Sequence, residues 1–169
     1  MGGGSHSKGI LILNGYIGKK YAQDIPLSLA ASICFEQLYS GIEGDSASSA
    51  ELFAILSSLS DLPIYQGIAA TGSVNQHGLI QPIGGAIFKI EGFFEICKMN
   101  GFSGRQGVII PYQNVKNLVL SDEVCEAVEK GDFNIYPIQT VDEGIEILTG
   151  VPAGEKLPDG TYPTGTVNE

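Results

Sequence analysis

The sequence is poor in the residues that build metal sites, disulfides and nucleic-acid interfaces. Its three cysteines, Cys34, Cys97 and Cys125, include no C-x-x-C pair, so they indicate small core residues rather than a disulfide framework or a zinc site. Lysine and arginine together number 9 against 19 aspartates and glutamates, which gives a formal net charge of −10. An acidic surface repels phosphate backbones, so we expect no nucleic-acid binding by this domain.

Further absences narrow the class of enzyme. No apolar run reaches the ~18 residues of a membrane span, and no G-x-x-x-x-G-K-[ST] motif marks a nucleotide site. Neither of the two histidines is a strong candidate for a catalytic base. His6 lies near the N-terminus, and His77 lies in the turn-like sequence Asn75-Gln-His-Gly78. A turn histidine next to glycine is usually exposed, so a Ser-His-Asp triad is disfavoured.

What the sequence does contain is enough apolar material for one core. Hydrophobic residues make up 43% of the chain and charged residues only 17%. Strand-like apolar runs alternate with helix-like segments, which predicts an α/β fold in a single compact domain. The predicted strands lie at 9–14, 66–73, 107–111 and 134–138, and the predicted helices at 24–39, 48–60, 86–100, 121–130 and 141–148.

The two ends of the chain differ in composition from the rest. Residues 1–6 are rich in glycine, lack the charged and apolar parts of a signal peptide and are interpreted as a cloning scar or tail. Residues 152–169 are rich in glycine and proline, which predicts a flexible C-terminal tail. We therefore expect the folded domain to span residues 7–151.

Ser46 lies just before a predicted helix and is a candidate nucleophile. The following Ser48-Ser-Ala-Glu51 has the S-x-x-E form of a capping box, and an apolar helical run comes next. Free backbone N–H groups and the helix dipole at such a start suit an oxyanion that forms beside a serine hydroxyl. The alternative is that this Ser/Asp-rich stretch is only an ordinary helix cap.

Lys89 is the candidate base for that serine. On a helical wheel it points away from Glu91 and Glu95 and lies beside Phe93 and Ile96, which predicts an apolar environment. A lysine held on an apolar face loses hydration and can become a neutral amine that accepts the serine proton. The alternative is a lysine whose amine extends from the apolar stripe to solvent.

These two residues are 43 positions apart, and the sequences around them resemble the proteolytic domain of Lon proteases. The resemblance covers residues 7–151 and rests on the stretches Glu43-Gly-Asp-Ser-Ala-Ser48, Thr71-Gly72 and Gln81-Pro-Ile-Gly-Gly-Ala-Ile-Phe-Lys-Ile-Glu91. In A-type Lon proteins a proline precedes the serine and a glycine follows two positions after it. Asp45 and Ser48 occupy those positions here, so the chain is closest to the B-type and B-like subfamily.

The resemblance implies the Lon proteolytic-domain fold, which is like domain 2 of ribosomal protein S5, and a catalytic dyad of Ser46 and Lys89. It implies that Thr71 orients the lysine amine, although a threonine in a strand is also a common β-branched filler. Glu43 and Asp45 match acidic positions that in B-type relatives can approach the dyad and favour an inactive arrangement. The alternative for both is an ordinary solvated loop acid.

The implied function is that of a serine endopeptidase that cleaves protein and peptide substrates in the cytoplasm. The full-length protein would be an ATP-dependent homohexamer, with ATP and Mg²⁺ bound to a separate ATPase module that this chain does not contain. No cofactor is expected in this domain. The alternative function is a catalytically silent Lon-like oligomerisation or docking domain of an ATPase, but such domains generally lack the serine and lysine together, so the peptidase is favoured.

Overall fold

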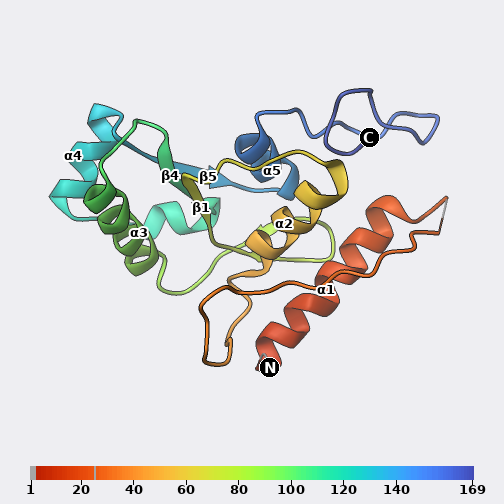
Figure 1. Cartoon of the computed structure of the whole chain (residues 1–169), viewed down its shortest axis with the longest axis horizontal. Helices are drawn as coiled ribbons and strands as arrows, with labels where there is room; N and C mark the ends of the chain where they lie inside the picture. The colour runs from red at the N-terminus through yellow and green to blue at the C-terminus, as the bar shows by residue number, and fades with distance from the viewer. Residues whose placement is uncertain (1–2, 25) are drawn as a thin grey trace.

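A short parallel sheet lies at the centre of the protein, with helices packed around it (Figure 1). The computed structural model describes residues 3–24 and 26–169. The helices are α1 (Gly4–Tyr21), α2 (Ser48–Ser60), α3 (Ala86–Asn100), η1 (Tyr112–Asn117), α4 (Asp122–Lys130) and α5 (Val141–Thr149). The strands are β1 (Ile68–Ala70), β2 (Ser73–Val74), β3 (Ile80–Gln81), β4 (Gln106–Pro111) and β5 (Phe133–Ile138).

The sheet has the order β1-β4-β5, and both of its pairings are parallel. Its middle strand β4 is a continuous apolar run that is buried on both faces, as expected for a parallel strand covered by helices. Strands β2 and β3 form a separate antiparallel pair directly after β1. Parallel strands end at the same edge of a sheet, so the loops that follow β1, β4 and β5 start on one side of the protein.

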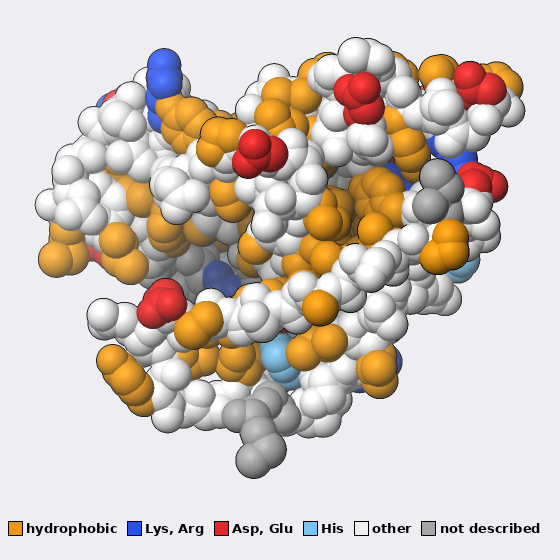
Figure 2. Space-filling model, turned by 45° about the vertical axis from the view of Figure 1, so that its right-hand side comes forward, with side chains coloured by type: hydrophobic (Ala, Val, Ile, Leu, Met, Phe, Trp, Pro, Cys, Tyr) orange, Lys and Arg blue, Asp and Glu red, His pale blue; other side chains and the backbone are white. Residues whose placement is uncertain are grey.

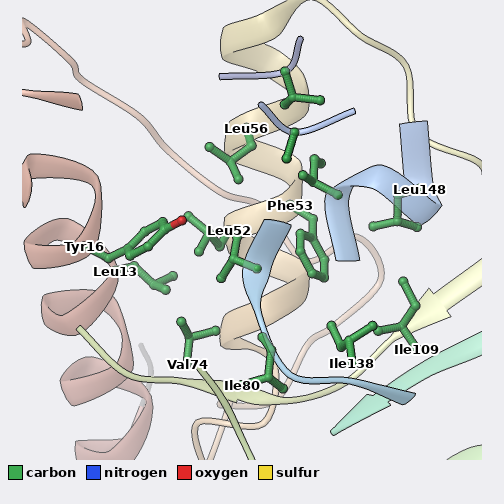
Figure 3. Close-up of a cluster of buried hydrophobic side chains, with 14 of the residues drawn as sticks. Leu13, Tyr16, Leu52, Phe53, Leu56, Val74, Ile80, Ile109, Ile138 and Leu148 are labelled. Atoms are coloured by element: carbon green, nitrogen blue, oxygen red, sulfur yellow. The ribbon is translucent and has the colours of Figure 1, made fainter. Parts of the chain in front are cut away.

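Alternate side chains of β4 enter two hydrophobic cores. Ile109 packs into a core with α1, α2 and α5, part of which is drawn in Figure 3. Val108 and Ile110 belong to a second core with α3 and α4. Each large side chain that is fully buried in these cores contributes roughly 1.5–3 kcal/mol. The cores therefore fix α2 and α3 on opposite faces of the same strand.

The second half of the chain agrees closely with the sequence-based predictions. Strands β4 and β5 and helices α3, α4 and α5 are confirmed with shifts of at most a few residues at their ends. The structure adds the signals at their ends: Thr140 and Glu143 make a capping box at the start of α5, and Gly131 and Gly150 end α4 and α5 in the left-handed conformation. The α/β fold class is confirmed.

The first 40 residues differ from their predictions. The strand predicted at 9–14 is wrong, because this run lies within α1. The buried residues of α1 (His6, Gly9, Leu13, Tyr16 and Ile17) recur every three or four positions, a helical period that a short apolar run does not reveal. None of the helices in residues 3–24 and 26–169 combines the length and apolar character that crossing a membrane requires.

The helix predicted at 24–39 is also wrong over the described residues, which form no regular helix or strand there; Ile25 lies outside them. Its large aliphatic side chains, Leu27, Leu29, Ile33 and Leu38, are all exposed. A helix of this length is marginal in water unless packing of an apolar face stabilises it. Without such packing, the helix-start signals at Asp24 and Pro26 are not sufficient to form a helix.

The C-terminal segment 152–169 contains no helix or strand, yet it contacts the first core. Ala153 and Val167 are buried there, and the hydroxyl of Tyr21 donates a hydrogen bond to the Asn168 side chain at 2.6 Å. At the other end of the chain, His6 lies within α1, while Met1 and Gly2 lie outside the described residues. The division of the chain after residues 6 and 151 stays a prediction.

The cysteines divide into two kinds. Cys97 is buried on α3, and burial raises the pKa of its thiol, which fits a small unreactive core residue. Cys34 and Cys125 are exposed, so the expectation of core residues is wrong for these two. Cys34 lies in the irregular segment, and Cys125 faces outward from α4.

Candidate functional site

Ser46 and Lys89 meet beside the end of β1. The lysine Nζ lies 2.9 Å from the serine Oγ, which is hydrogen-bond distance. The same Nζ lies 3.4 Å from Oγ1 of Thr71, the first residue after β1. Three residues that are far apart in the sequence therefore place one amine and two hydroxyls together.

Backbone hydrogen bonds hold the loop that carries Ser46 against the segment after β1. The N–H of Gly72 donates to the Ser46 carbonyl at 2.9 Å, and the N–H of Ser49 donates to the Gly72 carbonyl at 3.0 Å. Gly72 has little room, since a Cβ there would lie 3.0 Å from the Ile80 side chain. These contacts fix the position of the Ser46 backbone relative to that of Thr71.

The hydroxyl of Thr71 connects this backbone to the lysine. It donates a hydrogen bond to the Ser46 carbonyl at 3.2 Å, because a carbonyl oxygen can only accept. A hydroxyl has one proton, so towards Lys89 it acts as an acceptor. The threonine thus offers a lone pair to the amine.

The predicted capping box at the start of α2 is wrong. Ala47 is the N-cap residue, and no side chain caps the helix. The carboxylate of Glu51 instead pairs with His6 of α1, with 2.7 Å between Oε1 and Nε2, and both residues are buried. Within the described residues, the N–H groups of Ser46 and Ala47 donate no hydrogen bond to another group of the chain.

Lys89 is exposed, contrary to the apolar environment predicted for it. The buried face of α3 consists of Ala86, Ile90, Phe94 and Cys97, and the last three belong to the second core. Lys89 lies at the edge of this stripe, and its side chain extends to Ser46 rather than into the core. In the part of the chain that the structure describes, its amine forms no ion pair.

Sequence reasoning missed Asn114, which lies in η1 and holds the segment that leads into α3. Its side chain is buried and binds the backbone of Ile83 twice, accepting from the N–H at 3.0 Å and donating to the carbonyl at 2.9 Å. Gly85, the N-cap residue of α3, follows two residues later and no side chain caps the helix, so the two bonds from Asn114 help to fix the start of α3. No local sequence signal identifies such a residue, because its partner is 31 positions away.

The two acidic candidates lie apart from the lysine in this structure. Asp45 accepts a hydrogen bond from the Ser73 hydroxyl at 2.9 Å, a contact that sequence reasoning also missed. Glu43 is exposed. Neither forms an ion pair with Lys89.

His77 lies in a separate region. It is exposed in the predicted turn, where the Asn75 side chain accepts the N–H groups of His77 and Leu79, and its Nδ1 lies 3.0 Å from Nζ of Lys19. It lines a pocket of about 520 Å³ together with Tyr16 and the start of α5. Ser46, Thr71 and Lys89 do not line this pocket. A triad with Ser46 is therefore excluded.

The face shown in Figure 2 is hollowed near its middle, with a Lys or Arg side chain visible in the hollow and hydrophobic side chains around much of it.

Comparisons with known proteins agree with the resemblance seen in the sequence. Residues 41–150 match the family model of the Lon protease (S16) C-terminal proteolytic domain. A Lon protease homolog of Escherichia coli is 45% identical over 148 residues, which are 88% of this chain and 25% of that protein. A homolog of Haemophilus influenzae is 41% identical over 168 residues, which are 99% of this chain and 28% of that protein.

The archaeal Lon protease of Thermococcus kodakarensis is 42% identical over 113 residues, which are 67% of this chain and 16% of that protein. Archaeal relatives among the matches agree with the predicted B-type assignment. The chain thus spans about a quarter of the length of the two bacterial relatives, 25% and 28%.

Proposed function

Because this chain belongs to the family of Lon protease C-terminal proteolytic domains, we propose that it is a serine endopeptidase domain that hydrolyses peptide bonds with Ser46 and Lys89. The observation that carries the proposal is the 2.9 Å contact between the serine Oγ and the lysine Nζ. A base must lie within hydrogen-bond reach of the proton that it takes, and this pair meets that condition.

In the proposed reaction, the neutral amine of Lys89 accepts the Ser46 proton while Oγ attacks the carbonyl carbon of the substrate. The resulting ammonium then donates that proton to the leaving amine, which gives an acyl-enzyme. A water molecule, deprotonated by the same amine, hydrolyses the ester and regenerates the serine. One lysine thus serves as base and acid in turn.

The surrounding groups support two further roles. The lone pair that Thr71 offers to the amine, 3.4 Å away, would orient it towards Ser46. The N–H groups of Ser46 and Ala47 lie just before α2, whose dipole adds positive potential there. We assign these N–H groups to the oxyanion hole, where no particular side chain is required.

The full-length protein would supply the remaining parts. We propose that ATP and Mg²⁺ bind to an ATPase module outside this chain, that the assembly is a cytoplasmic homohexamer and that its substrates are proteins. This proposal rests on the Lon relatives, of which the chain covers about a quarter, 25% and 28%. Glu43 and Asp45 stay candidates for regulating the dyad.

A serine-reactive fluorophosphonate tests the assignment directly. We expect covalent labelling of the wild-type chain and no labelling of Ser46→Ala, because Oγ is the attacking atom. Ser48→Ala is the matched control from the same cluster, since Ser48 is buried and should not react. A folded wild-type chain that takes no label, alone or joined to its ATPase module, would instead support a silent docking domain.

A further inference from the structure

Ser73 makes a contact that the proposed reaction does not use. It lies in β2 with 5% of its surface exposed, and its hydroxyl donates a hydrogen bond to Oδ2 of Asp45 at 2.9 Å. Asp45 directly precedes Ser46 and is half-buried. A buried hydroxyl on one element therefore holds the carboxylate next to the nucleophile on another.

The backbone of the serine loop does not depend on this contact. The Ser46 carbonyl already accepts the N–H of Gly72 and the Thr71 hydroxyl, and Ser48 donates its N–H to the Asp45 carbonyl at 3.1 Å. The bond from Ser73 therefore decides mainly where the Asp45 side chain points. Without it, the carboxylate could rotate about its own side-chain bonds while the loop backbone stays in place.

The position of this carboxylate matters because of Lys89. The lysine amine lies 2.9 Å from the hydroxyl of the residue next to Asp45 and has no carboxylate partner among the described residues. An aspartate released from Ser73 would be attracted to that amine. An ion pair favours the charged ammonium, and an ammonium cannot accept the serine proton.

We propose that Ser73 is a positioning residue that keeps the Asp45 carboxylate away from Lys89 and so keeps the base free. The inference rests on the proposed dyad and adds a mechanism by which that site is kept active. Strand β2 is suited to this role, because the pairing of Ser73 with Gln81 of β3 holds the backbone from which the hydroxyl projects.

The test measures the rate of fluorophosphonate labelling, with circular dichroism and urea unfolding to establish that each variant is folded. Ser73→Ala should slow labelling about tenfold, because a base contributes at least that much to the rate. Ser73→Thr retains the hydroxyl and should restore a rate near that of the wild type. Ser57→Ala is the matched control, because it removes a serine hydroxyl that donates at 2.6 Å to the Leu62 carbonyl at the far end of α2.

A second set of variants separates positioning from a general structural role. In an Asp45→Ala background, Ser73→Ala should change the labelling rate by less than about twofold, because the carboxylate on which it acts is gone. A tenfold loss that persists without Asp45 would overturn the proposal, as would failure of Ser73→Thr to restore the rate.

Two further outcomes keep the test decisive. If Ser73→Ala does not fold, the near-isosteric Ser73→Cys, whose thiol is only a weak donor, takes its place with the same expected loss. Persistent labelling of Ser46→Ala would reject the dyad itself, whereas loss of that label with no effect of Ser73→Ala would reject only the positioning role.

Discussion

At the scale of single residues, the polar contacts around the lysine amine define the site better than its burial does. Ser46, Thr71 and Lys89 could each be predicted from the sequence because each belongs to a short matching stretch. The exposure of Lys89 could not be predicted, because a helical wheel gives the direction of a side chain but not the element that the side chain contacts. The same limit applies to Glu51, whose partner His6 lies 45 positions away.

Replacing Lys89 by arginine should abolish labelling of Ser46 and peptide hydrolysis. A guanidinium stays charged and cannot accept the serine proton, so a loss of about 10²–10⁴-fold is expected. Lys98→Arg is the control on the same helix, since Lys98 is an exposed partner of Glu123. Hydrolysis by the Lys89→Arg variant within about tenfold of the wild-type rate would exclude the lysine as the base.

Replacing Thr71 by valine should slow labelling about tenfold while leaving the fold intact. Valine keeps the shape of the side chain but removes both hydroxyl contacts, and the Ser46 carbonyl still accepts the N–H of Gly72. The free energy of unfolding should fall by only about 0.5–1.5 kcal/mol, the usual effect of one lost hydrogen bond. Thr71→Ser should behave like the wild type; equal rates for valine and serine variants would show that the hydroxyl does not orient the amine.

At the scale of elements, close packing places the helices that carry the site. The later helices and strands could be predicted because caps, left-handed glycines and long apolar patterns agree there. The irregular structure of segment 24–39 could not be predicted. Its cap-like start at Asp24 and Pro26 is visible in the local sequence, whereas the lack of a buried face depends on the rest of the fold. Asn114 and Ser73 escaped prediction for a related reason, since each acts on a partner in another element.

Gly144 is a point of close contact between α5 and α2. A Cβ there would lie 2.3 Å from the ring of Phe53, which is buried in the first core and cannot move easily. We therefore expect Gly144→Ala to lower the free energy of unfolding by about 1–3 kcal/mol in urea. Gly92 on α3 is the matched control: a Cβ there meets nothing within 4 Å, so Gly92→Ala should be neutral or stabilise by about 0.5–1 kcal/mol. Equal stability of the two variants would contradict this view of the packing.

At the scale of the whole molecule, the net negative charge opposes self-association, whereas the exposed apolar side chains favour it. The chain has a formal net charge of −10, yet helix α3, which carries Lys89, also exposes Phe88, Ile96 and Met99. Composition predicted one domain with one core, and the structure divides that core into two parts on either face of β4. A single strand buried on both sides gives no sequence signal for such a division.

Added salt should strengthen any self-association of the chain. Salt screens the repulsion between acidic copies within a Debye length of about 8–10 Å at moderate ionic strength and leaves apolar contacts intact. Sedimentation velocity over a series of salt concentrations measures this directly. Tighter assembly at low salt than at high salt would show that specific ion pairs, rather than apolar contacts, hold the copies together.

The hydrogen bond between His6 and Glu51 also bears on where the domain can be trimmed. A chain shortened to begin at residue 7 loses the imidazole and leaves a carboxyl group, of which 2% is exposed, without this partner. Leaving a buried polar group without its hydrogen-bond partner typically costs about 1–3 kcal/mol. The shortened chain should therefore unfold at a lower urea concentration, and Glu51→Gln should recover part of that loss. The glycine-rich N-terminal segment would then contribute to the stability of the folded domain rather than being a dispensable tag.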